Sequence, residues 1–129
     1  MAEGFPATTG DIFTAADYNG LVAFTIGAAN TVDYTASISD AYQVCKLMNK
    51  ATAIAYKIPT NASVAFPIGT VLNILNIGAG TCTISAVTSG TTTVLSAGAT
   101  PAQPTLAQYR SAACIKTGTD TWYVVGAIA

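Results

Sequence analysis

The chain has 129 residues, of which 51% are hydrophobic and only 9% are charged, and its formal net charge is −1. This length fits one ordinary domain, while so few cations exclude binding along a nucleic-acid backbone, which needs many of them to neutralise phosphates. A typical soluble protein carries about 25% charged residues, so this surface must be rich in Thr, Ser, Asn and apolar groups, which favours a subunit of an assembly.

The first thirty residues differ in pattern from the rest. Thr14 and Asp17 have the spacing of a capping box, and Gly20 is placed to end a helix of one or two turns. Residues 1–30 are therefore expected to form either an arm that docks on a neighbouring protein or a strap over the chain's own domain, and the arm is preferred. The apolar anchors of this segment are Phe5, Ile12, Phe13 and Leu21.

From Thr31 onward the pattern is typical of short β-strands. Residues 70–77 are β-branched and mostly apolar on both faces, which predicts a strand in the middle of a sheet. Gly78 and Gly80 predict a tight hairpin into the next strand, and residues 118–120 predict another. The other expected strands are 32–38, 42–48, 53–58, 81–87, a short one around 94–95, 106–117 and 122–128.

These elements predict an all-β fold for residues 31–129. Turns recur at intervals of about ten residues, which indicates a single-domain β-sandwich or partly closed barrel of about eight short antiparallel strands. Trp122 is expected to be a core anchor. The full expected core is Ile54, Ile58, Val71, Ile74, Leu75, Ile84, Ile115, Trp122 and Val124.

Catalytic and metal-binding chemistry is poorly represented. The chain has no histidine, which removes the usual general base and metal ligand. Its carboxylates occur singly, so no acid pair and no calcium loop is expected. Three scattered cysteines among small or apolar neighbours indicate buried reduced thiols. We therefore expect no enzyme, no catalytic residue, no metal and no cofactor, and the apolar runs are too short for a membrane helix.

Two stretches carry a resemblance to a known group of proteins. The first is NASVAFPIGT at 61–70, continued by VLNILNIGAG at 71–80, and the second is GTDTW at 118–122. They resemble a small β-rich module of tailed-bacteriophage structural proteins, which occurs in decoration proteins, head fibres and tail fibres. The similarity extends over residues 47–129. The stretch GDIFTAADYN at 10–19 is also similar to the start of several phage virion proteins.

The resemblance implies a virion structural protein that is made in the host cytoplasm. The short chain favours a capsid decoration (cement) protein, a homotrimer that binds the major capsid protein on the capsid surface. Phe5, Ile12, Phe13 and Leu21 would then contact the capsid or a neighbouring subunit. The alternative is a head-fibre or tail-fibre tip that binds a host-surface carbohydrate, with Tyr109 and Tyr123 lining its groove. A depolymerase fragment is a third reading, which requires carboxylates that converge in space.

Overall fold

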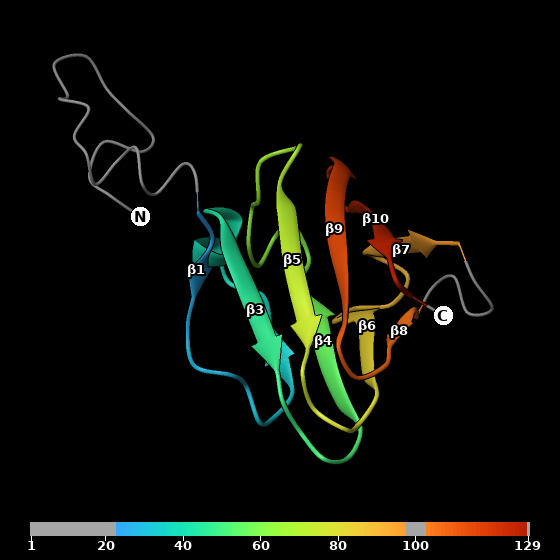
Figure 1. The fold of residues 1–129 in the computed structure, drawn as a ribbon. Coiled ribbons are helices and arrows are strands. Elements are labelled where there is room, and N and C mark those ends of the chain that lie inside the picture. Colours follow the sequence, from blue (N-terminus) through green and yellow to red (C-terminus); the bar gives the residue numbers. More distant parts are fainter. Residues whose placement is uncertain (1–22, 98–102, 129) are drawn as a thin grey trace, which may run out of the picture.

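The computed structural model describes residues 23–97 and 103–128. These residues contain ten strands and one 3-10 helix, η1 (Ile38–Ala41). The strands make two sheets that enclose one core (Figure 1). The six-stranded sheet contains, in spatial order, β1 (Thr25–Ile26), β3 (Val44–Met48), β5 (Val71–Asn76), β9 (Arg110–Gly118), β10 (Thr121–Gly126) and β7 (Thr93–Ser96). The four-stranded sheet contains β2 (Tyr34–Thr35), β4 (Ile54–Ile58), β6 (Cys82–Ala86) and β8 (Thr105–Leu106). Within these ranges no helix is long and apolar enough to span a membrane.

The β-rich class is confirmed, but the expectation of antiparallel strands is wrong for every pairing among the first six strands and for β7, which pairs in parallel with β10. After β1, β3 and β5 the chain crosses to the other sheet, so β1, β3 and β5 lie parallel in one sheet and β2, β4 and β6 lie parallel in the other. The pairs Cys45–Asn73 and Tyr56–Ile84 have the same separation in sequence. The chain therefore stacks strand–turn–strand arches, each of which adds one strand to each sheet.

The hairpin expected at Gly78 and Gly80 is also wrong, because β5 and β6 belong to different sheets. The two glycines instead allow one arch to lie directly on the previous one. A Cβ atom on Gly78 would be 2.3 Å from the backbone nitrogen of Lys50, and one on Gly80 would be 1.8 Å from the carbonyl oxygen of Thr52. Any side chain at either position would push the stacked backbones apart.

The last strands are antiparallel, as expected. β9 and β10 form the predicted hairpin around Asp120, and β9 also pairs antiparallel with β5. The strand β7 closes this sheet by pairing in parallel with β10. The junction between arches and hairpin, where β5 meets β9, lies in the middle of the six-stranded sheet (Figure 1).

Of the predicted N-terminal segment 1–30, only residues 23–30 are described by the structure. The helix expected near Thr14 and Asp17 lies outside the described residues. Thr25–Ile26 forms β1 at the edge of the six-stranded sheet, and Asn30 makes an isolated bridge to Met48. The last part of the segment 1–30 is therefore paired with the strands that follow it.

The core prediction is correct for six residues and wrong for three. Ile54, Ile58, Ile74, Ile84, Trp122 and Val124 are buried between the sheets. Val71 is 39% exposed, and Leu75 and Ile115 are only half-buried. The reason is that alternate residues of a strand point to opposite faces, and only one face of the six-stranded sheet is covered by the other sheet.

Neighbouring residues of β5 should therefore respond differently to truncation. Ile74 is fully buried, so Ile74→Ala should cost about 2–5 kcal/mol of unfolding free energy through lost burial and a residual cavity. Leu75→Ala should cost less in the isolated subunit, because Leu75 points away from the core. Urea unfolding of both variants tests this difference, with Thr81→Ala as an exposed control. Equal losses for Ile74→Ala and Leu75→Ala would contradict the assigned faces.

Candidate functional site

A buried polar network joins the loop after β4 to the β9–β10 hairpin. The Lys116 ammonium donates hydrogen bonds to Asn61 Oδ1 at 2.7 Å and to the carbonyl oxygen of Phe66 at 2.6 Å. Asp120 Oδ1 accepts from the Asn61 backbone N–H at 2.8 Å and from the Thr92 hydroxyl at 3.2 Å. The network joins the two sequence stretches that carry the phage resemblance, because Asn61 and Phe66 belong to the first stretch and Asp120 to the second.

Aromatic packing completes this connection. The rings of Phe66 and Trp122 meet edge-to-face with centroids 5.5 Å apart, and Lys116 Nζ lies 5.9 Å from the centre of the Trp122 ring. Burial lowers the pKa of Lys116, while the negative charge of Asp120 acts in the opposite direction. Lys116 is only 2% exposed and is directed at neutral oxygen acceptors. Its role is to hold the loop on the sheet.

Removal of one acceptor should destabilise the fold. Asn61→Ala deletes one partner of the buried Lys116 ammonium, which should lower the unfolding free energy by about 1–3 kcal/mol. Ser63→Ala in the same loop is the matched control, because Ser63 is exposed and its hydroxyl bonds only locally to Thr60. Chemical denaturation followed by tryptophan fluorescence measures both. Indistinguishable midpoints for Asn61→Ala and Ser63→Ala would rule out a structural role for the network.

The carboxylates that the structure describes are held by structural partners. Asp40 is buried and accepts hydrogen bonds from the Tyr34 hydroxyl at 2.6 Å and the Ser37 backbone N–H at 2.9 Å, and Lys46 Nζ lies 3.6 Å away. Asp33 accepts from the backbone N–H of Ala55. Among residues 23–97 and 103–128, no three His, Cys, Asp or Glu side chains gather in a metal-binding group. The carboxylates of Glu3, Asp11 and Asp17 lie outside these ranges.

The cysteines are free thiols. Cys82 and Cys114 are buried, as expected, whereas Cys45 is half-buried. Burial raises the pKa of Cys82 to about 11 and that of Cys114 to about 12. A thiol is reactive as its thiolate, so these two side chains are protonated and unreactive at neutral pH.

The two tyrosines considered for a sugar-binding groove lie apart. Tyr123 pairs with Ile115 in the middle of the sheet, whereas Tyr109 precedes β9 at a backbone φ of 63° and is 76% exposed. Ile115 lies six positions after Tyr109 along extended chain, which corresponds to about 20 Å. The two rings are therefore too far apart to contact the same sugar ring.

The clearest unassigned surface is the outer face of the six-stranded sheet. Residues opposite each other in paired strands point to the same face. One row therefore crosses β5, β9, β10 and β7 through Val71, Ile115, Tyr123 and Leu95. By the same pairing, the other outward positions are Ile26, Cys45, Leu47, Asn73, Leu75, Thr93, Ser111, Ala113, Thr121 and Val125. Alternation along the chain adds Phe24 before β1 and Thr117 in β9.

None of these described outward positions carries a charge. The charged residues of the six strands, Lys46, Arg110 and Lys116, all occupy the alternate, inward-facing positions. The four-stranded sheet has the ordinary pattern, since Tyr56 and Ile84 point inward while Lys57, Thr83 and Ser85 point outward. Of these three cations, Lys116 is buried, Lys46 is half-buried and Arg110 is exposed at the start of β9. The six-stranded sheet therefore presents apolar and uncharged polar groups, and no cation, on its outer side.

Two shallow hollows lie on this outer face beside β1. One, of about 330 Å³, is lined by residues that include Cys45, Ala113 and Val125, and the other, of about 370 Å³, by residues that include Val71. Phe24 and Asn73 line both. Because Phe24 is 54% exposed and Ile26 57% exposed, the β1 edge of the face also presents protruding apolar groups.

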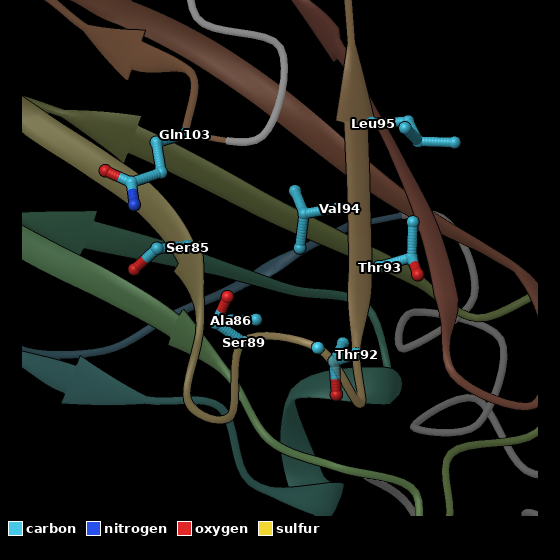
Figure 2. Close-up of a pocket in the computed structure, with 9 residues that line it drawn as sticks. Ser85, Ala86, Ser89, Thr92, Thr93, Val94, Leu95 and Gln103 are labelled. Atoms are coloured by element: carbon cyan, nitrogen blue, oxygen red, sulfur yellow. The ribbon is translucent and has the colours of Figure 1, made fainter.

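A third hollow, of about 260 Å³, lies between β6 and β7. Figure 2 shows Val94 pointing into it, toward the side of Ser85 and Gln103, while Leu95 points away on the opposite side of β7. Thr92 and Ser89 also line it. This hollow offers hydrogen-bonding groups, in contrast to the outer face.

The contact residues expected from sequence, Phe5, Ile12, Phe13 and Leu21, lie outside the described residues. Sequence reasoning missed the outer face, although its signal was present: residues 70–77 are apolar on both faces. Comparison with known proteins adds no assignment, because no protein-family model, no curated protein and no solved structure matches the chain.

Proposed function

We propose that this chain is a structural subunit of a tailed-bacteriophage virion, and specifically a capsid decoration protein that binds the major capsid protein as a homotrimer. The observation that carries the proposal is the uncharged, apolar outer face of the six-stranded sheet, where Ile26, Tyr123 and Val125 are 57%, 44% and 50% exposed. Exposed apolar patches of this kind mark protein–protein contacts. The sequence resemblance supports the virion as the assembly.

The mechanism would be passive. A sandwich of two sheets provides a stiff body, and protein surface laid across the joints between capsid subunits adds contacts that must break before the shell opens. A subunit so poor in charge relies on apolar and backbone contacts, which salt screens only weakly. The segment 1–30 would act as an arm, with Phe5, Ile12, Phe13 and Leu21 reaching the capsid or a neighbouring subunit. Neither nucleic acid nor membrane is a partner in this proposal.

Rebinding to capsids tests the function directly. Purified full-length chain is mixed with phage capsids stripped of their accessory proteins, and pelleted capsids are analysed for bound chain. Stoichiometric rebinding that raises the temperature of capsid rupture supports the proposal. Absence of rebinding to capsids of a phage that encodes this chain would refute it.

The hydroxyl-lined hollow between β6 and β7 favours one alternative, a head-fibre or tail-fibre tip that binds host-surface carbohydrate. Ser85 and Gln103 supply donors and acceptors of the kind that a sugar requires. Binding of the isolated chain to an array of bacterial surface glycans, abolished by Gln103→Ala, would favour this alternative over decoration.

A further inference from the structure

We propose that the outer face of the six-stranded sheet, centred on the row Val71, Ile115, Tyr123 and Leu95, is the surface through which copies of this chain bind one another. The inference rests on the proposed function, because it assigns the interface of the proposed homo-oligomer. The occupant of the face is thus a second copy of this chain rather than the capsid or the chain's own N-terminal segment.

The charge distribution favours a second copy. A surface without charge can meet a copy of itself without like-charge repulsion, whereas a charged partner would normally be matched by opposite charges on this face. Copies of the chain also repel each other little at long range, because the formal net charge is −1. The described charges of the six strands all occupy inward positions, so burying the outer face leaves none of them unpaired there.

The size of the face is also suitable. The six strands range from two residues in β1 to nine in β9. At about 3.3 Å per residue and about 4.8 Å between strands, their flat area is roughly 500 Å², and the relief of the side chains increases the accessible area. A stable interface buries about 800 Å² on each partner. The flat area is smaller than this, so a specific contact between two copies needs the whole face together with the relief of its side chains.

The outer face has both projecting side chains and hollows, the two features that a complementary contact between copies requires. Phe24 and Ile26 project at the β1 edge, and the two hollows lie beside them over β3, β5 and β9. A projecting edge of one copy can enter a recess of another, which gives the close packing that interface cores require. The outward face of the four-stranded sheet presents mainly Thr, Ser and Lys side chains instead.

A pair of lysine substitutions at outward positions tests the proposal. Ile115 is half-buried at the middle of β9 on the outer face, and Thr83 is half-buried in β6 on the opposite outer face. Sedimentation equilibrium of the full chain should show that Ile115→Lys weakens self-association at least tenfold, while Thr83→Lys leaves it unchanged. Circular dichroism verifies that each variant is folded. Should Ile115→Lys fail to fold, Tyr123→Lys at the 44% exposed neighbour replaces it.

Cys45 gives a second measurement because it lies on the same face. Its thiol should react slowly with a thiol reagent in the wild-type oligomer and several times faster in the dissociated Ile115→Lys protein. Cys82 and Cys114 are buried in the core and should remain slow in both. A wild-type chain that is monomeric at micromolar concentration, or an Ile115→Lys oligomer as stable as the wild type, would overturn the proposal.

Capsid rebinding separates the two proposals. If the wild-type chain rebinds stripped capsids but Ile115→Lys self-associates normally, the interface assignment fails and the function stands. If Ile115→Lys dissociates the oligomer but the wild type does not rebind capsids, the interface stands and the decoration function fails. A monomer whose outer face is protected by its own residues 1–22 would also overturn the interface, because Cys45 would then be slow to react without any oligomer.

Discussion

The free energy of unfolding should fall steeply above pH 9, because the core holds two thiols that cannot ionise there. Burial raises the pKa of Cys82 from 9.0 to about 11 and that of Cys114 from 9.0 to about 12. Between pH 9 and 11 the unfolded chain loses these protons while the folded protein keeps them. Each thiol then lowers the stability by about 1.4 kcal/mol per pH unit. Below pH 9 both states hold the protons and the effect is absent.

Lys116 works in the opposite direction over part of this range. The pKa of Lys116 is lowered in the folded protein, so the folded protein releases this proton at a lower pH than the unfolded chain does. Between the lowered pKa and the ordinary lysine value of 10.5, the unfolded chain therefore binds more protons, and the stability from this group rises with pH. Stability gained from this group partly offsets the loss from the thiols. Burial also raises the pKa of Tyr56 well above its ordinary value of 10, which adds to the loss above pH 10. The net decrease should therefore be about 1–3 kcal/mol per pH unit between pH 9 and 10, and it should be steeper above pH 10.

Urea unfolding at pH 8, 9, 10 and 11, with a reductant present, measures this slope. Cys114→Ala should be less stable than the wild type at pH 8, because it leaves a cavity. Its stability should nevertheless fall less steeply with pH, by about 1.4 kcal/mol per unit. Parallel pH profiles for the wild type, Cys82→Ala and Cys114→Ala would show that these thiols are not the cause.

The positions of most strands could be predicted from the sequence, but their pairing could not. Alternation placed strands close to β3, β4 and β5, and the hairpin at Asp120 was correct. Gly78 and Gly80 suit a tight hairpin equally well as an arch between sheets. The deciding contact is their close approach to Lys50 and Thr52, in the preceding arch, and such a long-range contact leaves no local pattern.

The prediction for β9 assigned the wrong side of the strand to the core, and this error has a specific cause. Lysine is rarely buried, so the alternation in 110–118 assigns Ile115 inward and Lys116 outward. The structure reverses both, because Asn61 and the carbonyl group of Phe66 satisfy the buried ammonium. The candidate outer face was missed for the same reason. In a single sequence, an apolar residue on an outer face that binds a partner has the same pattern as an apolar residue in the core. Both are buried in the assembled protein, so the sequence alone does not distinguish them.

Adjacent residues of β10 provide the sharpest test of the two faces. Trp122 is 1% exposed and packs edge-to-face on Phe66, whereas Tyr123 is 44% exposed on the outer face. Trp122→Ala should cost about 3–5 kcal/mol of unfolding free energy, since it removes the largest buried side chain between the sheets. Such a loss is a large share of the roughly 5–15 kcal/mol that stabilises a domain, so this variant should be partly unfolded or melt far below the wild type.

Tyr123→Ala is the matched aromatic truncation, one residue away on the same strand. In the dissociated subunit it should change the unfolding free energy by less than about 1 kcal/mol, because its ring is not part of the core. Thermal unfolding followed by circular dichroism, at a concentration low enough to dissociate oligomers, compares the two variants. A loss for Tyr123→Ala as large as that for Trp122→Ala would mean that the outer face is packed against the subunit's own chain. A small loss for Tyr123→Ala combined with weaker self-association would instead place this ring between copies, since only contacts that form on association stabilise the assembly without stabilising the subunit.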